Sequence, residues 1–321
     1  MHYWELVTRS FRIAWDHKYL WLIGLFSGEA GGSSFNYSQR STGTTQTPAQ
    51  FQQQVSTWLS DHLGLIIFLA VVWLVLIVAF FILAAICEGA TVRASAEHDA
   101  ERPFGLGMAW RAGLHTMWVI VRFRLLLLAL YLPLLILFVI WLVGLVSAIA
   151  NENRGATPVL VLAGLLLLVV WFVYAIYLFF LDRFGSRALV LEQLMARASI
   201  ARAHRLLLKR FGRSLLVLLL AIGVAIVLGI ALACVSLIVV VPFVAGAFAA
   251  GSNSGAAVVV LVIGVLILLP VYLVVAGFLA AQGSTYWTLA FRRLDFDHAP
   301  AYAYPTAPYP PASPAPPAPQ P

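Results

Sequence analysis

Long apolar stretches without charged residues alternate along this chain with shorter segments that carry the polar positions. The five longest run from His62 to Cys87, Leu125 to Ala150, Thr157 to Leu181, Leu215 to about Val240, and Ala256 to Ala281. About 20 apolar residues, each rising 1.5 Å along a helix, cross the roughly 30 Å of hydrocarbon in a bilayer. The pattern therefore predicts an all-α, polytopic membrane protein.

A shorter apolar run, Tyr19 to Phe26, comes before these five. If Arg93 is cytoplasmic, Asp61 must be outside, so the chain has to cross once before residue 62. We expect a first helix that begins near Trp4, lies at the interface in its first turns and enters the bilayer with its apolar end. A re-entrant first segment is the alternative, because non-helical backbone is tolerated at membrane depth when protein buries it.

The basic residues collect in alternate loops. With the short run counted as the first of six, 18 of the 20 Lys and Arg residues lie in alternate segments. These segments precede the first run, join the second to the third and the fourth to the fifth, and follow the sixth. The remaining loops hold only Arg40 and Arg154. Loops rich in Lys and Arg stay in the cytoplasm, so we predict six transmembrane helices with both termini in the cytoplasm. Sorting by loop indicates contact with anionic lipids of the inner leaflet rather than a nucleic-acid partner.

The chain also has a weak threefold period, with expected units of about 1–100, 101–193 and 194–298. Each unit holds a basic amphipathic helix, an outgoing span and a returning span that ends at a glycine: Gly89, Gly185 or Gly283. Glycine there favours close packing of helix backbones. The unit pattern predicts three hairpins of spans around a pseudo-threefold axis.

The amphipathic segments cover residues 4–17, 105–122 and 194–209. We expect them to lie on the cytoplasmic membrane surface, with apolar side chains in the acyl boundary. Their expected contacts to lipid phosphates are Arg12, Arg111, Arg202, Arg205, Lys209 and Arg210. The alternative is that they are cytoplasmic connecting helices packed on one another.

In the apolar stretch from Leu215 to about Val240, small residues recur at every fourth position: Ala221, Ala225, Gly229 and Ala233. Such a stripe lets two membrane helices approach closely, so we expect a tight helix contact there. Residues 299–321 are rich in Pro, Ala and Tyr and predict a disordered cytoplasmic tail beyond the membrane domain of residues 1–298.

Little of the sequence suggests chemistry. The chain is 62% hydrophobic and 10% charged, it holds no nucleophile elbow, zinc-protease or nucleotide-binding motif, and its seven His residues do not stand at metal-ligand spacing. We therefore expect no enzyme, no cofactor and no metal. Glu88, Asp182 and Gln282 stand at the inner ends of the returning spans, where they would pair with Arg93, Arg183 or Arg187 or form a substrate or ion site. Residues 97–101 predict a solvated acidic turn.

Three segments carry a family resemblance: residues 12–22, residues 182–192 and residues 285–294. They resemble a large group of uncharacterised bacterial integral membrane proteins, and are similar to the membrane domain attached to some glycerophosphoryl diester phosphodiesterases. That family's activity resides in a separate barrel domain, which this chain lacks, so no catalytic residue carries over. The resemblance implies a bacterial cell membrane, and 18 Arg against 2 Lys fits a GC-rich bacterial genome.

Two functions of different classes follow from this pattern. The first is a non-enzymatic scaffold that organises lipids or an unidentified partner protein at the inner membrane face. The second is a small transporter or channel, with a path between the three hairpins. A transporter needs polar side chains along that path, whereas a scaffold does not.

Overall fold

The computed structural model describes residues 3–27, 58, 60, 62–151, 155–249 and 254–295. These residues form α-helices and no strand, in agreement with the predicted all-α class. The helices are α1 (Tyr3–Asp16), α2 (Tyr19–Phe26), α4 (Leu63–Asp99), α5 (Leu106–Ala150), α6 (Ala156–Leu191), α7 (Ala196–Lys209), α8 (Phe211–Ala249) and α9 (Ser254–Leu294). The predicted tail lies outside the described residues.

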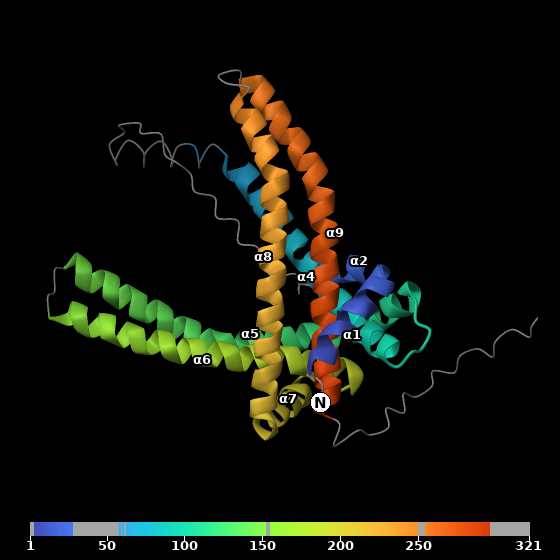
Figure 1. Cartoon of the computed structure of the whole chain (residues 1–321). Helices are drawn as coiled ribbons and strands as arrows, with labels where there is room; N and C mark the ends of the chain where they lie inside the picture. The colour runs from blue at the N-terminus through green and yellow to red at the C-terminus, as the bar shows by residue number, and fades with distance from the viewer. Residues whose placement is uncertain are drawn as a thin grey trace, which may run out of the picture.

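The helices form one compact region and three projecting arms (Figure 1). We call the compact region the base; it consists of residues 3–27, 82–127, 178–221 and 278–295. The arms are residues 63–81 of α4, the α5–α6 hairpin over 128–177, and the α8–α9 hairpin over 222–277. In Figure 1 the α5–α6 arm and the α8–α9 arm leave the base in clearly different directions.

The arms are apolar on all sides. In α4, for example, Phe68, Trp73 and Leu74 are each more than 60% exposed. A helix that is apolar all round is stable only inside a protein core or in lipid. Five helices of the described chain are long and apolar enough to cross a membrane, which is the pattern of a multi-pass membrane protein.

The predicted number of six spans is not reproduced, since the described chain holds five candidates. The expected first span, beginning near Trp4, is divided into two helices: α1 ends at Asp16, and α2 starts anew at Tyr19. At 8 residues α2 rises only about 12 Å, which is too short to cross. The segment that would have to complete the crossing lies outside the described residues.

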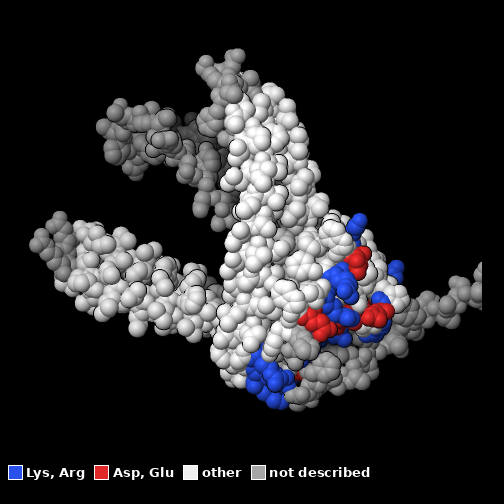
Figure 2. Space-filling view, in the orientation of Figure 1, with Lys and Arg blue, Asp and Glu red and all other residues white. Residues whose placement is uncertain are grey.

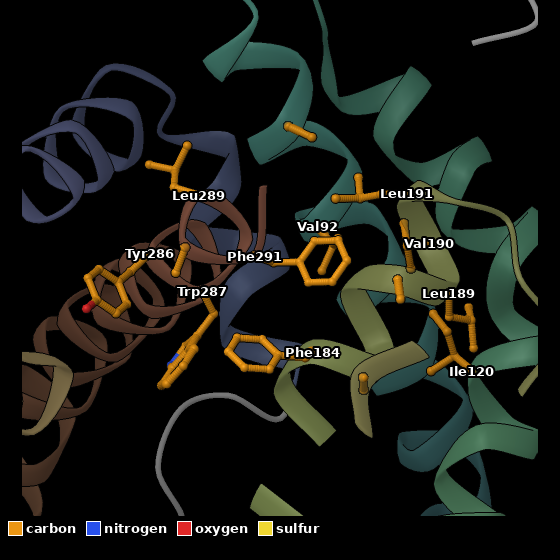
Figure 3. Close-up of a cluster of buried hydrophobic side chains, with 14 of the residues drawn as sticks. Val92, Ile120, Phe184, Leu189, Val190, Leu191, Tyr286, Trp287, Leu289 and Phe291 are labelled. Carbon is orange, nitrogen blue, oxygen red and sulfur yellow. The ribbon is translucent and has the colours of Figure 1, made fainter. Parts of the chain in front are cut away.

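The core of the base forms where the final turns of α4, α6 and α9 meet (Figure 3). Phe184 of α6 lies 6.0 Å from Trp287 and 6.3 Å from Phe291, both on α9, measured between ring centroids. Val92 of α4 and Leu189 of α6 are also buried there. Because aliphatic and aromatic side chains fill this meeting point, it is a packed core rather than a pore.

The helices of the base pack in a repeating order. α1 and α2 lie on α9, the first half of α5 lies on α4, and α7 lies on α6. The leading segment of each expected unit thus packs on the returning helix of another unit: first on third, second on first, third on second. This packing order is the one expected for three units arranged head to tail in a ring. The boundaries of the units remain a prediction from the sequence.

Glycines make two of these contacts possible. A Cβ added at Gly277 of α9 would lie 2.5 Å from the carbonyl oxygen of Trp21, and one at Gly24 of α2 would lie 2.8 Å from the amide nitrogen of Ala281. A Cβ at Gly113 of α5 would collide with the carbonyl oxygen of Ile86 in α4. Only hydrogen fits at these crossings, so the backbones touch directly.

Candidate functional site

Among the described residues, charged side chains lie only on the base (Figure 2). The described residues of all three arms contain no Asp, Glu, Lys or Arg. Every charged side chain of the described chain therefore lies on one end of the molecule, and this end is the candidate functional surface.

Asp99, at the end of α4, connects three helices of the base. Its carboxylate accepts a hydrogen bond from Nε of Arg9 in α1 at 2.7 Å and another from Nη1 of Arg292 in α9. Arg9 also donates to the Asp99 carbonyl oxygen at 2.8 Å, and Arg292 to that of Ala96 at 3.1 Å. Charge-assisted bonds of this length are among the stronger polar contacts in proteins, and here they hold the base together.

The prediction of a solvated acidic turn at residues 97–101 was therefore wrong. Glu97 is 6% exposed and pairs with Arg93 at 3.1 Å and with Arg102 at 3.0 Å. His98 stacks on His17 with ring centroids 3.5 Å apart, and its Nε2 lies 2.6 Å from the Tyr19 hydroxyl. Burial, together with the neighbouring His17, lowers the pKa of His98 to about 4, so the ring is neutral at pH 7.

Glu88 and Gln282, two of the three predicted inner-edge residues, are buried in separate helix contacts. Glu88 accepts from Arg124 of α5 at 2.6 Å, and Arg124 also donates to the Ser27 carbonyl oxygen at 3.2 Å. This partner differs from the Arg93, Arg183 or Arg187 that the sequence suggested. Gln282 donates to the Ser10 hydroxyl of α1 at 3.2 Å.

The third residue, Asp182, is half-buried in α6, and its carbonyl oxygen accepts a bond from the Ser186 hydroxyl at 2.8 Å. The structure thus places the three residues in three different surroundings and does not gather them into one site. The side chains of Glu88 and Gln282 each join two helices of the base.

Arg202 occupies a different position from the one expected. It donates to Asp295 at 2.6 Å and to Glu192 at 3.2 Å, so its guanidinium links the ends of α6 and α9 instead of facing lipid. Of the other five expected lipid contacts, Arg210 is half-buried, whereas four side chains are exposed: Arg12, Arg111, Arg205 and Lys209.

The amphipathic helices also bury more than expected. Leu6, Val7 and Ile13 of α1 are at most 6% exposed because they face the base rather than an acyl boundary. The same holds for Leu206 and Leu207 of α7. This agrees with the alternative of packed connecting helices, although Trp4 and Trp15 of α1 are 65% and 61% exposed and can still reach a membrane interface.

A family model matches residues 7–290, which is most of the chain. The chain belongs to DUF7544, a family of unknown function. No curated protein and no solved structure matches it. These findings agree with an uncharacterised integral membrane protein, whereas the resemblance to phosphodiesterase-linked membrane domains gains no support from them.

The returning-span glycines of this DUF7544 chain differ from one another. A Cβ at Gly89 would collide with the Thr116 side chain, and one at Gly185 would lie 2.6 Å from the ring of Phe123. A Cβ at Gly283 would meet open space. Close packing therefore explains the first two glycines and not the third.

The expected tight contact along the α8 stripe is not formed. Ala225, Gly229 and Ala233 are exposed, and Ala221 is half-buried. The first three members of the stripe, Ala221, Ala225 and Gly229, instead line a cavity of about 340 Å³ that Gly283 also borders. Within the described residues, no group of three His, Cys, Asp or Glu side chains could hold a metal ion.

Proposed function

We propose that this protein is a non-enzymatic scaffold of the bacterial inner membrane, whose arms span the bilayer and whose base lies on the cytoplasmic leaflet and gathers anionic lipids. The observation that carries the proposal is the separation of charge from the apolar arms within the described residues (Figure 2). The predicted loop charges favour the cytoplasmic side for the base, and hence for both ends of the membrane domain.

Four of the exposed cations, those predicted from the sequence to meet lipid, supply the lipid contact. Arg12, Arg111, Arg205 and Lys209 come from α1, α5 and α7, so they are distributed over three helices of the base. A basic side chain near an anionic membrane contributes about 1 kcal/mol of attraction. A distributed set of this kind enriches anionic lipids without selecting one molecule.

A transporter is less well supported by the geometry. The place where the three returning helices meet is filled by residues such as Phe184 and Phe291. The described arms diverge instead of enclosing a shared axis (Figure 1).

Orientation is tested by single cysteines. In a background with Cys87 and Cys234 replaced by Ala, Asn151→Cys at the tip of the α5–α6 arm and Lys209→Cys on the base are compared in intact cells. We expect an impermeant maleimide to label position 151 in intact cells and position 209 only after permeabilisation. Labelling of both from one side would refute the arrangement.

Lipid gathering is tested in nanodiscs that contain equal amounts of phosphatidylglycerol and phosphatidylcholine. Mass spectrometry of lipids that stay bound after transfer to mild detergent should show an excess of phosphatidylglycerol. Changing these four cations to Gln should lower the excess, whereas exchanging Arg for Lys, and Lys209 for Arg, should keep it because charge is retained. Equal retention of both lipids by the unmodified protein would disprove the proposal.

A further inference from the structure

The cavity between α8 and α9 is an elongated space at the boundary between base and arm. The two helices touch near the arm's tip, where a Cβ at Gly264 would lie 3.0 Å from the Phe243 ring. Toward the base they move apart (Figure 1), and the cavity of about 340 Å³ lies between them, closed on one side by α6.

Small side chains create this space. Ala225 and Gly229 form the α8 wall and Gly283 part of the α9 wall, and at both glycines an added Cβ would meet open space. The long apolar walls of the cavity suit a single hydrocarbon chain.

The depth of the walls matches a lipid. Gly229 lies roughly 20 Å of helix rise beyond Leu215, where the apolar stretch of α8 begins, so that end of the cavity is at hydrocarbon level. Arg183 and Gln282 border the cavity just after the apolar stretches of α6 and α9 end. This end is at headgroup level.

The headgroup end of the cavity is positive. The Arg183 guanidinium carbon lies 5.2 Å from the centre of the Phe179 ring, which holds the side chain in place. Among the described residues that line the cavity, none is Asp or Glu. Guanidinium carries five N–H donors and is suited to phosphate, and it can bind a headgroup in addition to any partner within the protein.

From these features we infer that the α8–α9 cavity binds one anionic phospholipid, with an acyl chain between Ala225 and Gly229 of α8 and the α9 wall, and the phosphate on Arg183. This inference rests on the proposed membrane placement of the base and arms. It adds a defined site, occupied by one molecule, to the distributed attraction of the surface cations.

The test uses the full-length protein in nanodiscs that contain a trace of phospholipid with a photoreactive diazirine in its acyl chain. After irradiation, mass spectrometry locates the labelled residues. With a phosphatidylglycerol probe we expect labels within 218–229 and 279–287, about tenfold above a phosphatidylcholine probe. Equal labelling by the two probes, or labels confined to other segments, would overturn the inference.

Matched variants separate the contribution of the lipid's acyl chain from that of its headgroup. Gly229→Leu fills the cavity and should lower labelling by both probes about tenfold, whereas Gly223→Leu, equally free of neighbours on another face of α8, should leave it unchanged. Arg183→Gln should remove only the preference for phosphatidylglycerol, and the exposed Arg213→Gln should not. Ala225→Phe provides a second blocking variant should Gly229→Leu fold poorly.

These outcomes are distinguishable from failure of the scaffold proposal. If the overall excess of phosphatidylglycerol persists while Gly229→Leu leaves labelling within 218–229 unchanged, the defined site is refuted and the scaffold stands. Crosslinking of the cavity to a second copy of the chain in place of lipid would also refute the site.

Discussion

The two halves of α4 differ in everything except their helical backbone. Over residues 63–80 the side chains are almost all exposed and apolar, whereas residues 85–92 and 94–97 are all buried. The helix passes from one environment to the other without a break. The arm half is stabilised by whatever surrounds the protein, and the base half is stabilised by other parts of the chain. An apolar side chain therefore contributes differently to folding stability in each half.

This difference predicts which substitutions will lower the stability of the protein. In the base, packing is close to that of a soluble core, where lost volume or added volume costs free energy. In the arms, lipid fills any volume that a side chain leaves. Four predictions, from the largest effect to the smallest, test this contrast.

The largest effect is expected from a Cβ at a helix crossing of the base. Gly113→Val drives its side chain into the Ile86 carbonyl of α4, whereas Gly144→Val, in the arm half of the same helix, meets open space. We expect Gly113→Val to cost about 4 kcal/mol or to prevent folding, and Gly144→Val to cost less than about 1. Folded yield by size-exclusion chromatography and thermal midpoints give the measurement; equal yields would contradict the base–arm distinction.

The second effect comes from removing core volume. Leu189 is 1% exposed in the base, and Leu74 is 61% exposed in the α4 arm. Leu189→Ala should lower the free energy of unfolding by about 3 kcal/mol because a cavity is left behind, and Leu74→Ala by less than about 1. Denaturant titration in lipid bicelles compares them. A larger loss for Leu74→Ala would mean that protein, not lipid, covers that arm.

The third effect concerns ion pairs of the base at different depths. Glu88→Ala leaves the Arg124 guanidinium without its carboxylate in a partly buried site and should cost about 2 kcal/mol. Glu5 pairs with Arg293 at 3.6 Å but is 55% exposed, so Glu5→Ala should cost less than about 0.5. A double-mutant cycle that finds no coupling between positions 88 and 124 would show that this pair contributes nothing.

The smallest effect is a pH dependence located in the base. The pKa of His98 falls from about 6.5 in the unfolded chain to about 4 in the folded one. The unfolded state therefore binds the proton more readily, and stability is lost as pH falls below 6.5 toward 4.

Between pH 7 and pH 5 this loss should amount to about 1 kcal/mol, allowing for the partial exposure of the ring. Thermal midpoints across this range measure it. His98→Gln should flatten the dependence, whereas His62→Gln at the tip of the α4 arm should not, and an unchanged slope in His98→Gln would assign the dependence to other groups.

The sequence predicted the arms better than the base. Apolar runs reveal contact with lipid, and the starts of α4 and α6 lie within one residue of the predicted starts at His62 and Thr157. The same runs end at Cys87 and Leu181, whereas the helices continue to Asp99 and Leu191. Beyond the lipid boundary the side chains are of mixed polarity, so hydrophobicity alone could not show that the helices go on.

The polar contacts of the base could not be predicted because their partners are distant in sequence. Arg292 and Asp99 are 193 positions apart, and no spacing rule joins them. Arg202 lies on the polar side of a basic amphipathic helix, but that pattern does not distinguish water, lipid phosphate and a carboxylate. Gly24, by contrast, was visible as the single glycine inside a short apolar run and could have indicated a helix crossing.

The ring order of packing also has a consequence for connectivity. α1 lies on α9, and Arg293 near the end of the described chain reaches Glu5 near its start at 3.6 Å. Because these two positions meet, residue 295 could be joined to residue 3 by a linker and the chain opened elsewhere, for example in the turn between Asp99 and Leu106. We expect such a circular permutant to keep the helix packing of the base, which would mean that the order in which the units are translated is not itself part of what holds this protein together.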